Sequence, residues 1–366
     1  DSGGLVSEFS PSWDGSKAIS DNISVVDAKG NAVIPGFVDS HTHLIWSGDR
    51  SNEMALRQNG LSYTEISQMG GGISKTVRST RQCTFEELVN IGTNNAKKAL
   101  MLGTTTLEAK SGYGLNLESE IAILSAYQLV NSRSNCDIHS TWLGAHDFPT
   151  NTTREDYIDE LIHKQLPEVC RLGIARWADV FCEPGWFTVD ESKEILLASN
   201  KLGLRPRAHV DEFVDSNGLA MAADIGCVSA DHVACSSDDA RSKADAAGVM
   251  QTFLPGTQYV MGMIDFPPMK SCLENSWAFS IASDFNPNCN SISMPFVGSL
   301  ATHRCGIDPI AALVASTRNP ATTFSDGEPP GCGSLTEGGN ASLNILTTNS
   351  VEGWCQSPGM NPISST

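Results

Sequence analysis

The sequence predicts an α/β fold, a (β/α)8 barrel, and three observations lead to this prediction. From Ala32 onward, short apolar runs rich in β-branched residues alternate with amphipathic stretches of helical length, which implies parallel pairing through right-handed crossovers. About eight such units occupy about 280 residues, which suits a closed barrel better than a doubly wound sheet. No GxGxxG or GxxxxGKS/T motif follows a strand, so dinucleotide-binding and P-loop folds lose their main support.

The predicted elements follow one another along the chain in strand and helix pairs. In chain order, the strands are Ala32–Val38, Thr104–Glu108, Asp137–Leu143, Ala178–Phe181, Arg205–His209, Cys227–Ala230, Val249–Phe253 and Ala278–Ala282. The helical pattern of apolar residues between them predicts helices over Phe85–Met101, Leu117–Asn131, Asp156–Leu172, Asp190–Leu202 and Pro309–Thr317.

The two ends of the chain differ from this middle part. Residues 1–20 are rich in Ser and Gly, and Ile23–Gly36 predicts a strand, a turn at Lys29–Asn31 and a second strand. Past Thr323, Pro, Gly and Ser return, with a strand-like run at Ala341–Thr347. We therefore expect a small accessory β-domain built from both chain ends beside the barrel, with divisions at residues 1–36, 37–323 and 324–366.

Composition excludes several classes of function. The chain has 366 residues with 24 Lys+Arg and 42 Asp+Glu, a net charge of −18, and no run of basic residues, which argues against nucleic acid and anionic membranes as partners. No stretch approaches about 18 consecutive apolar residues, so we expect no membrane span. The eleven cysteines form no CxxC pair and no signal peptide opens the chain, which predicts reduced thiols and a cytoplasmic enzyme.

The groups able to bind a metal follow predicted strands. His41 and His43 come just after the first strand, and in extended backbone residues i and i+2 point to the same side. His209, His232 and Asp284 end later strands. Singly, each has an ordinary alternative, as a satisfied histidine or a helix N-cap. Because barrel active sites lie at the carboxyl ends of the strands, the full set predicts a metal site there.

The chemistry of this set favours particular metals. Three imidazoles and one carboxylate suit Zn²⁺ or Fe²⁺, with one position left for water. The additional histidine, His232, is then expected to hydrogen-bond to that water or to a substrate. The residue types do not distinguish zinc from iron.

These residues and several longer motifs resemble the amidohydrolase superfamily and, within it, the imidazolonepropionase family of histidine degradation. The resemblance extends from about Val33 to Thr323. The motifs that support it are Pro35–His43 (PGFVDSHTH), Gly70–Ile73 (GGGI), Lys110–Gly114 (KSGYG), Gly144–His146 (GAH), Ala208–Phe213 (AHVDEF), Ser229–His232 (SADH) and Ser283–Pro287 (SDFNP). The HTH motif marks only the superfamily, whereas KSGYG, HVDE and DFNP in this order are far more specific.

The resemblance implies a metal-dependent hydrolase that opens the ring of the small anionic substrate 4-imidazolone-5-propanoate with water, giving N-formimidoyl-L-glutamate. It also implies a homodimer with one divalent or trivalent ion, zinc or iron, in each chain. The implied residues are His41, His43, His209 and Asp284 as metal ligands, Glu212, His232 and Asp284 as catalytic groups, and Arg50, Tyr63, Tyr113, His146 and Asn286 as substrate contacts.

The substrate's chemistry agrees with one of these assignments. An acidic protein must hold a carboxylate with a local cation, and Arg50 offers a planar bidentate fork, although a solvated loop charge is the alternative. Tyr63 and Tyr113 can donate hydroxyls to the same group. A nucleobase-type deaminase or another cyclic-amide hydrolase would not need these groups, and a non-catalytic scaffold would not need the complete ligand set. Which of Glu212, His232 and Asp284 is the main base stays open.

Three features depart from the family pattern or leave a choice. Asn288 and Cys289 stand where many members have Gly followed by Ser or Thr, which puts substrate contacts from that loop in question. Lys110 ends a strand where some relatives use a carboxylated lysine, but the matched family is mononuclear, so we expect Lys110 outside the metal shell. Members of the family start upstream of Asp1, so the accessory β-domain is expected to be truncated.

Overall fold

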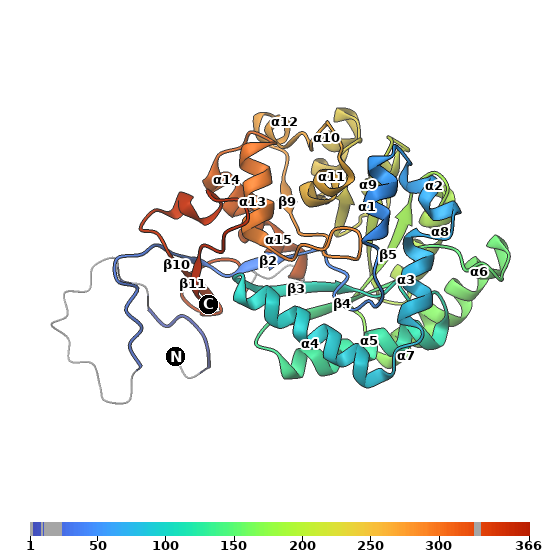
Figure 1. The fold of residues 1–366 in the computed structure, drawn as a ribbon, viewed down its shortest axis with the longest axis horizontal. Coiled ribbons are helices and arrows are strands. Elements are labelled where there is room, and N and C mark those ends of the chain that lie inside the picture. The colour runs from blue at the N-terminus through green and yellow to red at the C-terminus, as the bar shows by residue number, and fades with distance from the viewer. Residues whose placement is uncertain (1–2, 9, 11–23, 326–330) are drawn as a thin grey trace.

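A parallel sheet that is nearly closed into a barrel forms the centre of the computed structural model, which describes residues 3–8, 10, 24–325 and 331–366 (Figure 1). Its eight strands are hydrogen-bonded in chain order, as the sequence predicted. They are β2 (Phe37–Asp39), β3 (Thr104–Lys110), β4 (Asp137–Ala145), β5 (Trp177–Cys182), β6 (Arg205–Val210), β7 (Ser229–His232), β8 (Met250–Phe253) and β9 (Phe279–Ile281).

The first and last strands approach each other at their carboxyl ends. Thr42 and Phe285 form a parallel bridge, and the His43 N–H donates to the Phe285 carbonyl at 2.8 Å. The Asp284 N–H donates to the His41 carbonyl at 3.1 Å. These bonds hold the segments after β2 and β9 side by side, although the two strands are far apart in the sequence.

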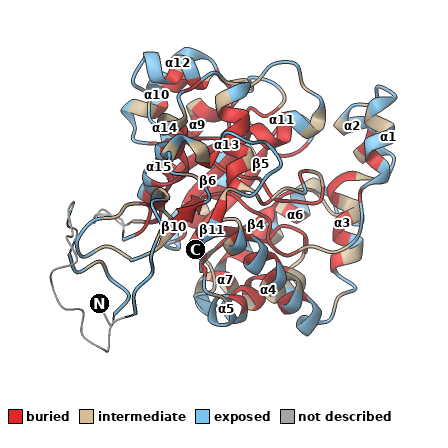
Figure 2. Ribbon diagram, turned by 60° about the vertical axis from the view of Figure 1, so that its left-hand side comes forward, coloured by how far each residue is buried: buried red, intermediate tan, exposed pale blue. Residues whose placement is uncertain are grey.

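Helices surround this sheet, and their buried faces turn toward it (Figure 2). Three of them begin with a capping box, in which a Ser or Thr and a Glu three residues later satisfy each other's backbone N–H groups. The helices are α1 (Asn52–Gln58), α2 (Tyr63–Gln68), α3 (Gly72–Thr80), α4 (Phe85–Met101), α5 (Leu117–Arg133), α6 (Arg154–Glu160), α7 (Leu166–Leu172), α8 (Val189–Lys201), α9 (Gly218–Ile225), α10 (Asp238–Ala246), α11 (Pro255–Met261), α12 (Met269–Glu274), α13 (Met294–His303), α14 (Pro309–Ser316) and α15 (Arg318–Ala321). Among the described residues, none of these helices has the length and apolar character needed to cross a membrane.

The predicted helix Asp156–Leu172 is confirmed with one irregularity. Between α6 and α7 lies a π-helical turn, Leu161–Gln165, in which the Leu166 N–H bonds to the Leu161 carbonyl. Pro167 follows directly and has no N–H to donate, so a regular α-helical bond is missing at this point. The wider turn accommodates that loss.

The prediction of one strand over Ala32–Val38 is wrong, because the chain changes sheets at Gly36. Residues before it form β1 (Val33–Pro35), and residues after it enter the barrel as β2. A Cβ on Gly36 would lie 2.2 Å from Thr105 Oγ1, so the close packing of the Thr105 side chain against this backbone requires glycine. The later strand predictions are confirmed, with ends shifted by one or two residues.

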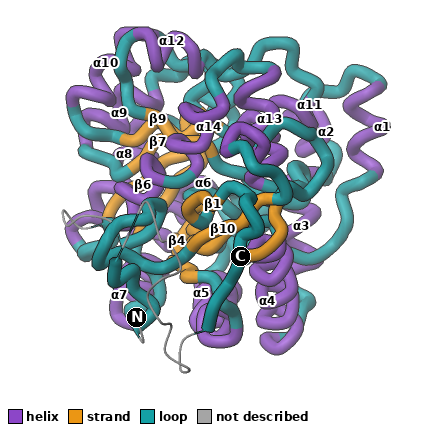
Figure 3. The backbone as a smooth tube through the Cα atoms, turned by 90° about the vertical axis from the view of Figure 1, so that its left-hand side faces the viewer, coloured by secondary structure: helices purple, strands orange, loops and turns teal. Residues whose placement is uncertain are grey.

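A separate antiparallel sheet is built from both ends of the chain (Figure 3). It consists of β1, β10 (Leu343–Leu346) and β11 (Ile363–Ser365), and Ile345 of β10 is paired with Val33. β10 realises the strand-like run predicted at Ala341–Thr347. The division of the chain into a barrel and an accessory domain at particular residues stays a prediction.

The strand predicted before the turn at Lys29–Asn31 does not form within residues 24–28. The turn itself is present, closed by a 2.9 Å bond from the Asn31 N–H to the Ala28 carbonyl. Val25 and Val26 are 61% and 75% exposed, and residues 24–28 have no strand partner in the described part of the chain. Residues 1–2, 9, 11–23 and 326–330 of the predicted accessory domain lie outside the described residues.

Candidate active site

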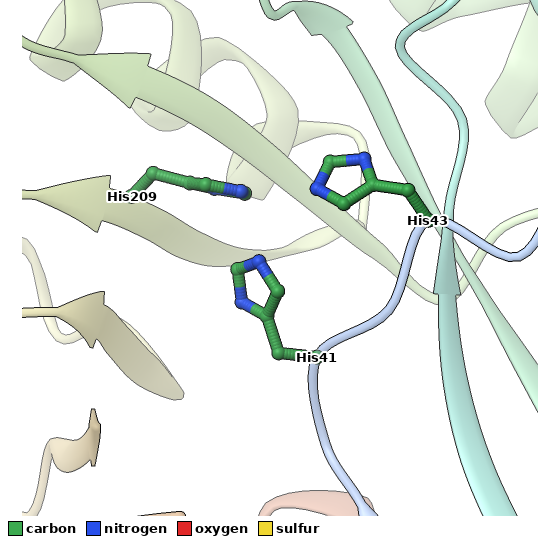
Figure 4. Close-up of side chains that lie close together, drawn as sticks. All are labelled: His41, His43 and His209. Atoms are coloured by element: carbon green, nitrogen blue, oxygen red, sulfur yellow. The ribbon is translucent and has the colours of Figure 1, made fainter. Parts of the chain in front are cut away.

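The predicted metal ligands converge at the carboxyl end of the barrel. His41 and His43 follow β2, His209 lies in β6, and Asp284 follows β9. One ring nitrogen from each of His41, His43 and His209 lies within 4.8 Å of the others, and the rings turn toward a common point (Figure 4). A second set of His41, His232 and Asp284 meets the same limit. The structure therefore brings all four predicted ligands and His232 together.

These donor atoms fit a Zn²⁺ or Fe²⁺ ion. Asp284 Oδ1 lies 3.4 Å from His41 Nε2 and 3.8 Å from His43 Nε2. His41 Nε2 and His209 Nε2 are buried without a hydrogen-bond partner. Buried polar atoms without partners are rare, and a metal ion is one explanation for them. Three imidazoles and a carboxylate are also the ligand types that both metals accept.

The electrostatic surroundings of the imidazoles agree with a cation at this point. Burial lowers the pKa of His209, and that of His43 well below its usual value, which favours the neutral form that binds metals. For His41, burial and the charge of Lys110 lower the pKa, but the hydrogen bond to Asp231 and the nearby Asp284 carboxylate raise it to about 9. The carboxylates of Asp231 and Asp284 therefore stabilise a positive charge at or next to the His41 ring.

Two aspartates behind the cluster orient the imidazoles, and sequence reasoning missed both. Asp231 Oδ2 lies 2.7 Å from His41 Nδ1, and Asp179 Oδ2 lies 3.0 Å from His209 Nδ1. The contact at His41 is a hydrogen bond, and a carboxylate bonded to Nδ1 fixes the tautomer so that Nε2 is left free to bind a metal. The contact at His209 is an ion-pair approach without hydrogen-bond geometry. The available signals were a charged residue within the apolar strand β5 and the Asp231-His232 pair that ends β7.

Glu212 and His232 face each other beside the cluster, with Glu212 Oε2 3.7 Å from His232 Nε2. Burial raises the pKa of Glu212 well above its usual value and lowers that of His232 to about 3. Glu183, a third residue missed from the sequence, accepts the backbone N–H groups of Glu212 and Phe213. The pair therefore tends toward a protonated carboxyl beside a neutral imidazole.

Asp284 differs from Glu212 in its hydrogen-bonding. Its Oδ2 accepts the Thr257 hydroxyl, and its Oδ1 accepts Asn286 Nδ2 at 2.8 Å. Burial raises the pKa of Asp284, but the close His41 ring and the neighbouring imidazoles outweigh this effect and hold the pKa well below its usual range. Asp284 also has a φ of 50°, a left-handed conformation that costs about 1–3 kcal/mol in a non-glycine residue.

The predicted substrate contacts line the same cavity as His43, His209 and Asp284. Arg50 donates from Nε and Nη2 to Glu53 Oε2, at 3.0 and 2.8 Å, and its guanidinium lies 5.5 Å from the Tyr63 ring centre. Burial raises the pKa of Tyr63, and that of Tyr113 well above its usual value, so both hydroxyls keep a proton to donate.

Two further residues predicted to contact the substrate, His146 and Asn286, already make contacts within the protein. The His146 ring stacks on His43 with centroids 5.0 Å apart, and its Nδ1 lies 2.9 Å from the Gly112 carbonyl. Asn286 Oδ1 accepts the N–H groups of Asn288 and Cys289, so this side chain shapes the loop as well as lining the cavity.

The two residues that depart from the family pattern have different surroundings. Asn288 lines the cavity, and its Oδ1 accepts Arg57 Nη1 at 2.7 Å. Cys289 is fully buried, with its Sγ 3.6 Å from the Ser283 carbonyl. Asn288 therefore connects the loop after β9 to helix α1, whereas Cys289 is a packing residue.

Comparisons with known proteins agree with this geometry. The amidohydrolase family profile matches residues 24–85. The imidazolonepropionase of Symbiobacterium thermophilum is 42% identical over 88% of this chain and 77% of its own length, and that of Haloarcula marismortui is 39% identical over 89% and 77%. The chain belongs to the imidazolonepropionase family. This family assignment confirms the resemblance drawn from the sequence motifs.

Solved structures share the fold at low sequence identity. The 5-methylcytosine deaminase of Klebsiella pneumoniae superposes with a TM-score of 0.71 at 17% identity, covering 95% of this chain and 88% of the deaminase. The atrazine chlorohydrolase of Arthrobacter aurescens, in a complex with zinc and atraton, gives a TM-score of 0.69 at 14% identity, covering 92% and 82%. This chain therefore has the same barrel fold as these solved structures.

Proposed function

We propose that this protein hydrolyses 4-imidazolone-5-propanoate to N-formimidoyl-L-glutamate, a step of histidine degradation. Membership of the imidazolonepropionase family supports this reaction. The observation on which the proposal depends is one cavity lined both by the histidine and aspartate cluster and by Arg50 with two tyrosines. The histidine and aspartate cluster suits hydrolysis of the substrate ring, and Arg50 with the two tyrosines suits binding of its carboxylate.

The arginine fixes the orientation of the substrate. Glu53 binds Arg50 Nε and Nη2 through one oxygen and Tyr63 lies against the same guanidinium, so we infer that its remaining N–H groups hold the propanoate. Tyr63 and Tyr113 keep their protons and donate to the same carboxylate. His146, stacked on His43, offers its Nε2 to the ring. With the carboxylate at Arg50, the imidazolone ring lies toward His41, His209 and Asp284.

The chemistry at the ring requires a proton acceptor and a proton donor. We infer that His41, His43, His209 and Asp284 hold one zinc or iron ion, which when bound polarises the carbonyl and makes water a better nucleophile. Asp284, held ionised, accepts the proton of the attacking water. Glu212, whose pKa burial raises well above its usual value, donates a proton to the ring nitrogen as the C–N bond breaks. The neutral His232 orients the water.

The test is to incubate the purified protein with freshly made 4-imidazolone-5-propanoate and follow the loss of ring absorbance in the ultraviolet. We expect turnover that a chelator removes and that added Zn²⁺ or Fe²⁺ restores. The control substrate is the unsubstituted imidazolone, which lacks the carboxylate and should react far more slowly. No turnover by metal-loaded protein, or turnover of cytosine instead, would contradict the proposal.

The proposed function also includes a cellular location and an oligomeric state. All eleven cysteines are free thiols, which suits a reducing compartment, so we propose a cytoplasmic location. We also propose a homodimer, on the basis of the family resemblance, and sedimentation equilibrium of the purified protein tests it.

A further inference from the structure

Lys110 is a buried cation that the proposed reaction does not use. It is the last residue of β3, and its side chain is fully buried. Its Nζ lies 2.9 Å from Glu108 Oε1, 2.7 Å from Asp179 Oδ2 and 3.6 Å from Asp231 Oδ2. A charge so far from water is stable only when it is paired, so these carboxylates and the ammonium depend on one another.

The two aspartates connect this lysine to the imidazoles. Asp179 uses the same oxygen, Oδ2, toward Lys110 and toward His209 Nδ1, which lies 3.0 Å away. Asp231 likewise presents Oδ2 both to Lys110 and to His41 Nδ1, which lies 2.7 Å away. One ammonium thus lies within ion-pair distance of both carboxylates that face Nδ1 of two predicted ligands, although Asp179 and Asp231 come from different strands.

Glu108 has a different place in the same group. Its Oε1 pairs with Lys110, while its Oε2 lies 3.3 Å from the backbone N–H of Thr42, the residue between His41 and His43. It contacts the lysine but neither predicted ligand ring. A change at Glu108 therefore alters the charge around Lys110 and leaves both aspartate–imidazole pairs in place.

We propose that Lys110 is a positioning residue of the metal centre. Its ammonium holds Asp179 and Asp231 in place, and through them it keeps the Nε2 atoms of His209 and His41 directed at one point. This inference rests on the proposed metal centre and adds to it the residue that organises its surroundings.

Removing the lysine has two opposite consequences, and their balance makes the proposal testable. A positive charge near the site repels a cation, so loss of the charge by itself strengthens metal binding. Loss of the groups that orient a metal ligand typically weakens binding by about 10–100-fold. If Lys110 acts by positioning, the net effect of removing it is weaker metal binding.

The experiment measures Zn²⁺ affinity of the metal-free protein by competition with a chromophoric chelator. The wild type is expected to bind one Zn²⁺, and Lys110→Met should bind it about 10–100-fold more weakly. Glu108→Gln is the matched control, because it removes a neighbouring charge and retains an acceptor for the Thr42 N–H; its effect should be much smaller. Equal or tighter binding by Lys110→Met would overturn the proposal. A wild type that binds no Zn²⁺ or Fe²⁺ would instead refute the metal centre itself.

A second comparison keeps the proposal testable if Lys110→Met folds poorly. Asp179→Asn preserves shape and removes the charge between Lys110 and His209, so it should weaken Zn²⁺ binding and alter the visible absorption of bound Co²⁺. If the variant with both Lys110→Met and Asp179→Asn folds, its fold-loss of Zn²⁺ affinity should be clearly smaller than the product of the fold-losses of the two single variants. Both substitutions act through the same contact. Fold-losses of Zn²⁺ affinity that multiply in the double variant would contradict the positioning role of Lys110. An Asp179→Asn variant with unchanged Zn²⁺ affinity and an unchanged Co²⁺ spectrum would contradict it as well.

Discussion

The two sides of the candidate active site are built in different ways. The site floor comes from barrel strands and the residues directly after them, is almost completely buried, and pairs each charge with another; it comprises His41, His209, Asp179, Asp231 and Lys110. The site rim comes from the connection between β2 and β3 and from the loop after β9, and includes more exposed residues (Figure 2); it comprises Arg50, Glu53, Arg57, Tyr63 and Asn288.

This difference has a physical origin. In a parallel barrel, all carboxyl strand ends meet at one edge, so the floor follows once the strands are in register. The rim depends on how a long connection folds over that edge, which local hydrogen bonds such as Arg50 with Glu53 decide. Changes in the floor should therefore abolish metal binding or chemistry, whereas changes in the rim should alter substrate affinity.

The largest effect is expected from His41→Ala in the floor. This change removes a proposed ligand and leaves Asp231 without its imidazole partner, so metal and activity should be lost together. Metal analysis of the purified protein and the ring-absorbance assay measure the two quantities. His163→Ala, at a histidine whose side chain is 69% exposed, is the control and should change neither. A variant that retains metal would show that His41 is not a ligand.

Next in size is Glu212→Gln, which keeps the shape of the side chain and its contact with His232. The amide cannot donate a proton to the leaving nitrogen as an acid does, so kcat should fall by about 10²–10⁴-fold while the metal content stays the same. Steady-state kinetics with metal analysis test this. If most of the rate survives, Asp284 or His232 must provide the proton instead.

In the rim, Arg50→Lys should act on binding. The change removes the planar fork and its bond to Glu53, so KM should rise by about 10-fold or more, the equivalent of about 1.5–3 kcal/mol for hydrogen bonds to a charged group. The effect on kcat and metal content should be small. A fall in kcat with KM unchanged would place Arg50 at the reacting atoms and weaken the distinction between rim and floor.

The smallest effect is expected from Arg57→Ala, which breaks the 2.7 Å bond to Asn288 at a half-buried position. A hydrogen bond of this kind contributes about 0.5–1.5 kcal/mol, so KM should change by less than about tenfold. Asn288→Gly, which removes the acceptor of the same bond, should give a similar change. Combining the two should add nothing further, and an additive double variant would show that the bond is not the cause.

The sequence by itself determined the strand and helix alternation, the nearly closed sheet and the groups at the strand ends, including all four predicted ligands. These features are readable because side-chain periodicity is local and strand ends in a barrel share one edge. Family motifs supplied the roles of Arg50 and the tyrosines, which no local pattern indicates.

Only the tertiary structure decided the rest. The change of sheet at Gly36 depends on contact with Thr105, and the missing strand before Lys29 depends on the absence of a partner for residues 24–28 in the described part of the chain. Asp231 lies 190 residues from His41, and Lys110 meets Asp179 and Asp231 only because other strands of the barrel bring them close. Such pairings leave no periodic signal, because burial and ion pairing join residues by distance in space and not by distance along the chain.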